Sequence, residues 1–178
     1  MTKITEINYF ELLDTLPSLK VDAAALKRTF FIKSREWHPD YFSHESELKQ
    51  SEALAMTSLL NQAYTALTDP LKRLSYFLTM HKIEITGNAQ ALPQMFLFEM
   101  MDLNESIESV STAAAKEQAE DSIATLESNL IKEVKDLFES DDLSSIDADS
   151  LDRLKTYYLK SKYLIRLRET LDRVNLDG

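Results

Sequence analysis

Residues 22–40, DAAALKRTFFIKSREWHPD, decide the fold of the N-terminal half. Asp22 is a good N-cap, and on a helical wheel one narrow apolar arc holds Ala23, Leu26, Phe30 and Trp37. This pattern predicts an amphipathic helix whose apolar arc faces the core. Proline cannot continue a helix and disfavours helical backbone at the residue before it, so the helix must end near Trp37. The next three residues, His38, Pro39 and Asp40, are therefore predicted to lie on a turn at the tip of a helical hairpin.

The sequence on either side of this stretch is also helical in pattern. Residues 7–16 predict a short first helix closed by Pro17, and residues 48–67 predict a long helix. Its buried stripe keeps the spacing of three and four residues, at Ala53, Met56, Leu60, Ala63, Tyr64 and Leu67. Asp69 before Pro70 is typical of a cap followed by proline at the first helical position, so a further helix should begin there.

The C-terminal half predicts a second helical domain. Residues 81–92 have mixed periodicity and contain Gly87, the only glycine before the last residue. Three helical stretches follow, at about 93–112, 113–139 and 149–175, and polar loops join them. Helices of this length predict an antiparallel three-helix bundle. With only 2 glycines and 4 prolines in 178 residues, the turns of a multi-stranded sheet are nearly absent, and the fold class is expected to be all-α.

Composition excludes several classes of function. The net charge is −10, and residues 81–178 carry most of the excess, with 11 Lys or Arg against 20 Asp or Glu. Such a chain repels phosphate backbones and anionic lipid, so we expect no binding to nucleic acid or membrane. There is no cysteine, and no apolar run approaches the length of a membrane span or a secretory signal. A cytoplasmic location is the simplest expectation.

Catalysis has little support in the sequence. There is no glycine-framed nucleophilic serine, no phosphate-binding glycine loop and no pair of histidines at metal-ligand spacing. His38, Asp40 and His44 are the only candidates for a metal-dependent hydrolase, and closeness in sequence is their only support. We expect a protein that is not an enzyme and that needs no metal or other cofactor.

The 22–37 helix has a second face that is basic. Lys27, Arg28 and Arg35 lie on it, with Phe31 among them, in a chain that is otherwise acidic. Taken alone, such charges most often form a solvated helix face. Next to the His38-Pro39-Asp40 turn, they are better explained as a surface that orients an acidic partner.

The order of these motifs resembles the J-domain of J-protein co-chaperones. The tripeptide follows a helix with a basic face and precedes Asn61-Gln62-Ala63-Tyr64 and then Asp69-Pro70-Leu71-Lys72-Arg73. The resemblance implies that a helical hairpin presents the tripeptide to a DnaK-type ATPase chaperone. The chaperone-binding residues would be His38, Pro39, Asp40, Lys27, Arg28 and Arg35. Asp40 could accept a bidentate arginine, and Pro39 would limit the entropy lost on docking.

The helix predicted from residue 93 carries two apolar stripes. Phe96, Met100, Leu103, Ile107 and Val110 share an arc of about 80°, enough to pack a bundle. Leu97, Phe98 and Met101 lie off that arc beside Asp102 and Glu105. This second stripe either packs beneath the first domain or is exposed to a partner protein, and periodicity does not separate these two interpretations.

The whole chain resembles the HscB family of co-chaperones of iron-sulfur cluster assembly. The resemblance rests on an N-terminal J-domain, a linker, and a helical domain that opens with Leu92-Pro93 and continues through Phe96 and Leu97. It implies a J-domain over 1–80, a linker over 81–92 and a three-helix scaffold-binding domain over 93–178. The N-terminal domain would stimulate ATP hydrolysis by the chaperone HscA, and the C-terminal domain would bind the scaffold protein IscU. Carried over by position, the scaffold-binding residues are Leu97, Phe98, Met101, Asp102, Glu105 and Tyr163.

The chain departs from the family pattern at three positions. Tyr41 follows the tripeptide where a basic residue is common, Ser109 stands where a carboxylate is expected, and Tyr163 replaces a frequent phenylalanine. The cysteine-rich N-terminal extension of eukaryotic members is missing, which favours a bacterial-type protein. A general J-protein that binds unfolded clients is the alternative function.

Overall fold

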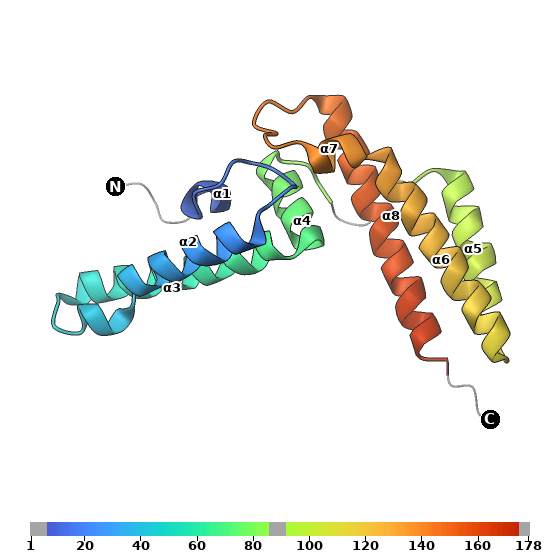
Figure 1. Cartoon of the computed structure of the whole chain (residues 1–178), viewed down its shortest axis with the longest axis horizontal. Helices are drawn as coiled ribbons and strands as arrows, with labels where there is room; N and C mark the ends of the chain where they lie inside the picture. Colours follow the sequence, from blue (N-terminus) through green and yellow to red (C-terminus); the bar gives the residue numbers. More distant parts are fainter. Residues whose placement is uncertain (1–6, 86–91, 175–178) are drawn as a thin grey trace. The chain divides into compact units, whose positions relative to one another are not determined.

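The computed structural model describes residues 7–85 and 92–174, and its regular elements within these ranges are all helical. The expected all-α fold class is therefore confirmed. Figure 1 labels the helices, whose bounds are α1 Tyr9–Leu12, α2 Ala23–Glu36, the 3₁₀ helix η2 Pro39–Phe42, α3 Glu47–Thr68, α4 Pro70–Met80, α5 Gln94–Glu108, α6 Ala113–Glu133, α7 Lys135–Glu139 and α8 Ala148–Asp172. The chain forms two compact units. Of the described residues, the first unit holds 7–77 and 136–146, and the second holds the rest.

The first unit is built on the hairpin of α2 and α3, which lie side by side and antiparallel (Figure 1). Asp22 caps α2 by accepting hydrogen bonds from the backbone N–H groups of Ala24 and Ala25, and this lowers the pKa of its carboxyl group. Leu26 is buried as expected, whereas Ala23, in the first turn of α2, is exposed. The core of the hairpin therefore begins one turn later than the helical wheel predicts.

The long helix α3 confirms its predicted stripe. Four of its residues are fully buried, namely Ala53, Leu60, Ala63 and Leu67. Met56 and Tyr64 are half-buried, and the Tyr64 ring stacks on Phe30 of α2 at 4.2 Å between centroids. The carboxylate of Asp69 accepts a hydrogen bond from Lys72 N at 2.8 Å, so the predicted cap of α4 is present.

Hydrogen bonds and a ring stack connect α1 and α4 to the rest of the first unit. The Tyr9 backbone N–H donates to the Tyr76 hydroxyl at 2.9 Å, and the two rings stack at 4.2 Å. Burial raises the pKa of Tyr76 above its ordinary value. Arg73 is 8% exposed and donates from Nε to the Leu19 carbonyl at 3.1 Å, and from a terminal nitrogen to the Leu67 carbonyl. Three segments that are distant in sequence are thus joined by hydrogen bonds.

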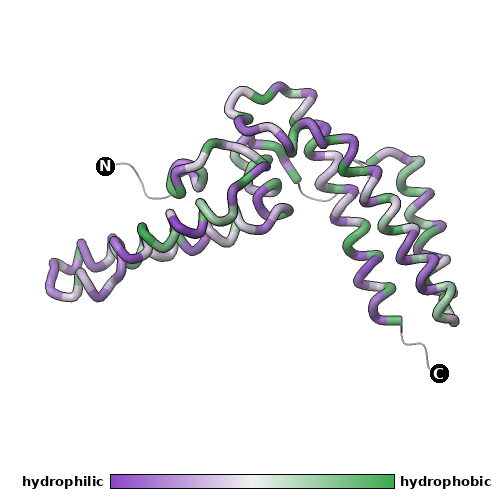
Figure 2. The backbone as a smooth tube through the Cα atoms, in the orientation of Figure 1, coloured by the Kyte–Doolittle hydropathy of each residue, from purple (hydrophilic) through white to green (hydrophobic). Residues whose placement is uncertain are grey.

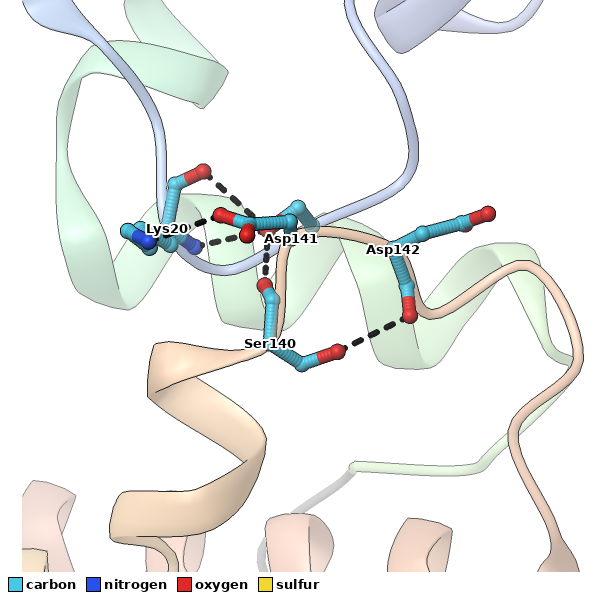
Figure 3. Close-up of polar contacts among 5 residues, drawn as sticks. Lys20, Ser140, Asp141 and Asp142 are labelled. Carbon is cyan, nitrogen blue, oxygen red and sulfur yellow. Dashed lines mark hydrogen bonds and ion pairs between the residues drawn. The ribbon is translucent and has the colours of Figure 1, made fainter.

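A short segment from the C-terminal half belongs to the first unit. The Lys20 ammonium lies 2.7 Å from an Asp141 carboxylate oxygen (Figure 3), and this contact raises the pKa of Lys20. Beside it, the Ser18 hydroxyl donates to the Ser140 carbonyl at 2.6 Å, and Leu143 N donates to the Pro17 carbonyl at 2.7 Å. These contacts attach residues 136–146 to the stretch between α1 and α2.

The second unit packs α5, α6 and α8 around an apolar core. Its fully buried side chains include Met100, Ile107, Ile123, Leu154 and Leu164. Figure 2 shows hydrophilic and hydrophobic residues recurring along each of these helices, as expected when one face of a helix is buried. The stretch predicted as one helix over 113–139 is broken at Val134, whose φ and ψ are −128° and 13°, and the chain resumes as α7. The predicted domain boundaries at 80 and 93 stay a prediction.

Candidate functional site

The candidate site has two parts, of which the first is the turn at the tip of the α2–α3 hairpin. Trp37 ends α2, and Pro39 begins η2 at a position where its missing N–H costs nothing. The His38 ring caps η2, since its Nδ1 accepts a hydrogen bond from Asp40 N at 3.3 Å. Because Nδ1 is used as the acceptor, Nε2 remains as the hydrogen-bond donor of the neutral ring. Asp40 keeps its side chain 86% exposed, so its carboxylate is accessible to a partner.

Residues of α3 and η2 hold the backbone of the turn in place. The Thr57 hydroxyl donates to the Trp37 carbonyl at 2.9 Å, which satisfies a carbonyl that the end of α2 leaves free. The Trp37 and Phe42 rings stack at 5.9 Å with an interplanar angle of 10°. Both contacts hold the backbone on either side of the tripeptide, so little order has to be acquired on binding.

The basic face of α2 is free to meet a partner. Lys27, Arg28 and Arg35 are all exposed, and within the described ranges no ion pair engages any of the three. Lys33 of the same helix differs, because it pairs with Asp14 at 2.6 Å and donates to the Leu12 carbonyl. Lys33 thus has a packing role, whereas the other three cations are exposed and form no ion pair, although the charge of Arg28 acts on the Asp22 carboxylate.

A hollow beside the turn contains residues that sequence reasoning did not assign to the site. It is lined by Phe31, Ser34, Arg35, His38, Asp40 and Tyr41. Phe31 and Tyr41 bring apolar surface next to the tripeptide. The position of Phe31 among the basic residues of the helical wheel was the sequence signal that could have found it.

The second part of the candidate site is an exposed face of α5. Leu97, Phe98, Met101, Asp102 and Glu105 are spaced so that they lie on one side of a helix. Phe98 is 60% exposed and Met101 is 57% exposed, while Leu97 is half-buried at the edge. Within the second unit this apolar stripe is not packed into the core, and carboxylates flank it. We call these five residues the α5 patch.

Tyr163 lies next to this helix on α8. Its ring meets the buried Phe96 edge-to-face at 6.2 Å, and Lys160 Nζ lies 5.6 Å from the centroid of the same Phe96 ring. Tyr163 is half-buried, so part of its surface remains accessible beside α5. The structure thus places Tyr163 against Phe96, on the packed side of α5, and its membership of one surface with the α5 patch stays a prediction. Ser109, where a carboxylate was expected, ends α5 and donates its hydroxyl to the Ser106 carbonyl at 2.8 Å.

The structure gives no support to a metal-dependent hydrolase built on His38, Asp40 and His44. His38 Nδ1 and Asp40 lie 3.6 Å apart, but in residues 7–85 and 92–174 no group of three His, Asp or Glu side chains is placed to hold a metal ion. The described part of the chain therefore offers no donor set for the proposed hydrolase. None of the helices within the same ranges combines the length and the apolar character that crossing a membrane requires.

Known proteins resemble this chain over nearly its whole length. Residues 92–172 match the family model described as the HSCB C-terminal oligomerisation domain. The chain is 31% identical to the co-chaperone protein HscB homolog of Shewanella halifaxensis, covering 94% of this chain and 97% of the relative. It is 29% identical to the human iron-sulfur cluster co-chaperone protein HscB, over 92% of this chain and 67% of that protein.

Solved structures agree with these relatives. The crystal structure of human HscB superposes with a TM-score of 0.78 at 28% identity, covering 94% of this chain and 81% of that one. HscB from Vibrio cholerae gives a TM-score of 0.77 at 27% identity, covering 93% and 96%. The sequence and the fold point to one group of proteins, a J-domain followed by a helical C-terminal domain. This chain therefore belongs to the HscB family of co-chaperones, which are not enzymes themselves and work with an Hsp70-type ATPase.

Proposed function

We propose that the chain stimulates the ATPase of the DnaK-type chaperone HscA and delivers the iron-sulfur scaffold IscU to it, in support of iron-sulfur protein maturation. The observation that carries the proposal is the capped turn, in which His38 holds the Asp40 amide while the Asp40 carboxylate stays exposed. An exposed carboxylate on a rigid turn is a suitable acceptor for an arginine of the ATPase.

The basic face of α2 would orient the same partner. Lys27, Arg28 and Arg35 attract an acidic surface, and exposed charges of this kind act mainly on the rate and the direction of encounter. His38, Pro39 and Asp40 would then make the contacts that trigger ATP hydrolysis. The family relationship supports this division of roles, because HscB co-chaperones work with an Hsp70-type partner.

The α5 patch, together with Tyr163, would hold IscU. Its exposed phenylalanine and methionine supply apolar contact area, and Asp102 and Glu105 add charge that can select a basic rim on the scaffold. The name of the human relative, an iron-sulfur cluster co-chaperone, supports this class of client. A location in the cytoplasm is compatible with the bacterial relatives and with the lack of cysteine.

The test is an ATPase assay with purified HscA. His38→Gln and Asp40→Asn should abolish stimulation, and both variants should keep wild-type helicity and wild-type IscU affinity, because the turn and α5 belong to different compact units. Normal stimulation by either variant would remove the role given to the tripeptide. A chain that binds unfolded peptides promiscuously and forms no discrete complex with folded IscU would instead be a general J-protein.

A further inference from the structure

The hollow beside the His38-Pro39-Asp40 turn has two aromatic walls. Phe31 is 58% exposed and Tyr41 is 64% exposed, although both belong to residue types that usually bury more of their surface. Phe31 comes from α2 and Tyr41 from η2, and both line the same hollow together with Arg35. The lining of the hollow thus combines two aromatic rings with a cation, the Asp40 carboxylate and polar groups.

Neighbouring groups limit the movement of both rings. The Phe31 ring lies 5.6 Å from Phe30, and Lys27 Nζ lies 5.9 Å from its centroid. The Tyr41 ring meets His38 edge-to-face at 6.1 Å, and Tyr41 N donates to the His38 carbonyl at 3.0 Å. Aromatic rings with two torsions and close neighbours lose little entropy when a partner covers them.

The charges around the hollow indicate the chemistry of the occupant. The exposed carboxylate of Asp40 lines the hollow, and the proposed function pairs it with an arginine of the partner. The cations outnumber it: Arg35 also lines the hollow, and Lys27 Nζ lies 5.9 Å from the centroid of the Phe31 ring. Arg28 is exposed on the same helix, and within the described residues no ion pair engages these three cations. The whole chain is acidic, so this is a local reversal of charge. A complementary surface therefore presents an apolar side chain with carboxylates beside it.

We propose that Phe31 and Tyr41 form an aromatic clamp that receives an apolar side chain from an acidic surface of the Hsp70-type partner, with Arg35 pairing with a neighbouring carboxylate. This inference rests on the proposed function and adds to it the residues that set the affinity of the chain for its Hsp70-type partner. The tripeptide triggers hydrolysis, while the clamp sets how tightly the partner is held. Tyr41, where a basic residue is common in the family, is then a site of specificity: it exchanges a charge contact for an apolar one.

The test is the dependence of the HscA ATPase rate on the concentration of the full-length chain. Phe31→Gln with Tyr41→Gln should raise the concentration for half-maximal stimulation by about tenfold, since aromatic anchors dominate interface affinity, and should leave the maximal rate unchanged. Leu16→Gln is the matched control, because Leu16 is 57% exposed and lies before α2, away from the turn. It should behave as wild type, and Phe31→Leu with Tyr41→Phe should restore most of the affinity.

The dependence on salt concentration distinguishes the contribution of the aromatic clamp from that of the basic face of α2. The tenfold effect of the double variant should persist between about 0.05 and about 0.3 M NaCl, whereas the effect of Lys27→Gln should shrink with screening. If the Phe31→Gln, Tyr41→Gln chain reached half-maximal stimulation at the same concentration as the Leu16→Gln chain, the clamp would be overturned. The proposed function would still stand in that case, provided that the wild-type chain stimulates HscA and the Asp40→Asn chain does not. A wild-type chain that does not stimulate HscA would overturn both.

Discussion

Truncating Phe98 on α5 should weaken binding of IscU by about 30-fold. Phe98 is 60% exposed, and a phenylalanine presents about 200 Å² of surface, so a partner can cover about 120 Å². At about 25 cal/mol per Å², this burial is worth about 3 kcal/mol, and fixing the side chain costs about 1 kcal/mol. The remaining 2 kcal/mol or so corresponds to the expected factor in Kd.

Met101→Ala provides a second measurement on the same face. Met101 is 57% exposed, and fixing its flexible side chain costs about 1.5–2 kcal/mol, so it should contribute about 1 kcal/mol, a factor of about five in Kd. Ile131→Ala is the control, because Ile131 is an exposed apolar residue of α6 and belongs to no part of the α5 patch. Calorimetric titration of the full-length variants with IscU gives all three values.

Two results would refute this reasoning. One is a loss below about threefold for Phe98→Ala, which would mean that the exposed ring is not covered in the complex. The other is an equal loss for Ile131→Ala and Met101→Ala, which would mean that affinity follows apolar area anywhere on the second unit. Unfolding curves that match wild type would show that either result reflects binding.

Substitutions at three further positions test the hydrogen bonds that stabilise the first unit. Thr57→Val removes the hydroxyl that donates to the Trp37 carbonyl and should lower the free energy of unfolding by about 1 kcal/mol in urea, while Thr57→Ser should not. Burial raises the pKa of Tyr76, so wild-type stability should be full below about pH 10 and fall as pH rises through the pKa of the folded state. Tyr76→Phe, which leaves the Tyr9 N–H without this acceptor, should be less stable at pH 7 and show a shallower fall; parallel curves would contradict the assignment. Arg73→Met leaves two buried carbonyls without their donor and should cost about 2–3 kcal/mol in urea unfolding, and an unchanged midpoint would contradict this.

Local chemistry made the helix ends and the hairpin predictable. Asp22 and Asp69 cap the helices that they were expected to cap, and Pro39 ends one helical pattern and opens the next. These signals act over four residues or fewer, so the sequence contains them directly. Helical periodicity also predicted a second apolar stripe at Phe98 and Met101, apart from the arc that buries Met100, but it left open whether that stripe is packed or exposed.

Features that depend on distant contacts were not predictable. The break at Val134 has no proline or glycine near it, and the segment around Asp141 joins the first unit through Lys20, 121 positions away in sequence. The helical wheel placed Ala23 on the buried arc, but Ala23 is exposed in the first turn of α2. Similarly, the hollow at Tyr41 exists only because η2 folds back beside α2. Helical periodicity reports only on the residues of one helix, whereas these features depend on how separate segments of the chain pack against one another.

The central claim is that one chain joins the scaffold to the chaperone. Linking two binding events raises the effective concentration of the second, so the wild-type chain should stimulate HscA most strongly when IscU is present at limiting concentration. A mixture of two chains tests this most directly. One is the Asp40→Asn chain, which keeps the α5 patch, and the other is the chain with both Phe98→Ala and Met101→Ala, which keeps the turn but should bind IscU at least about 30-fold more weakly. The claim predicts that the mixture stays at the ATPase rate of the Phe98→Ala, Met101→Ala chain alone, and a mixture that reaches the wild-type rate would contradict it.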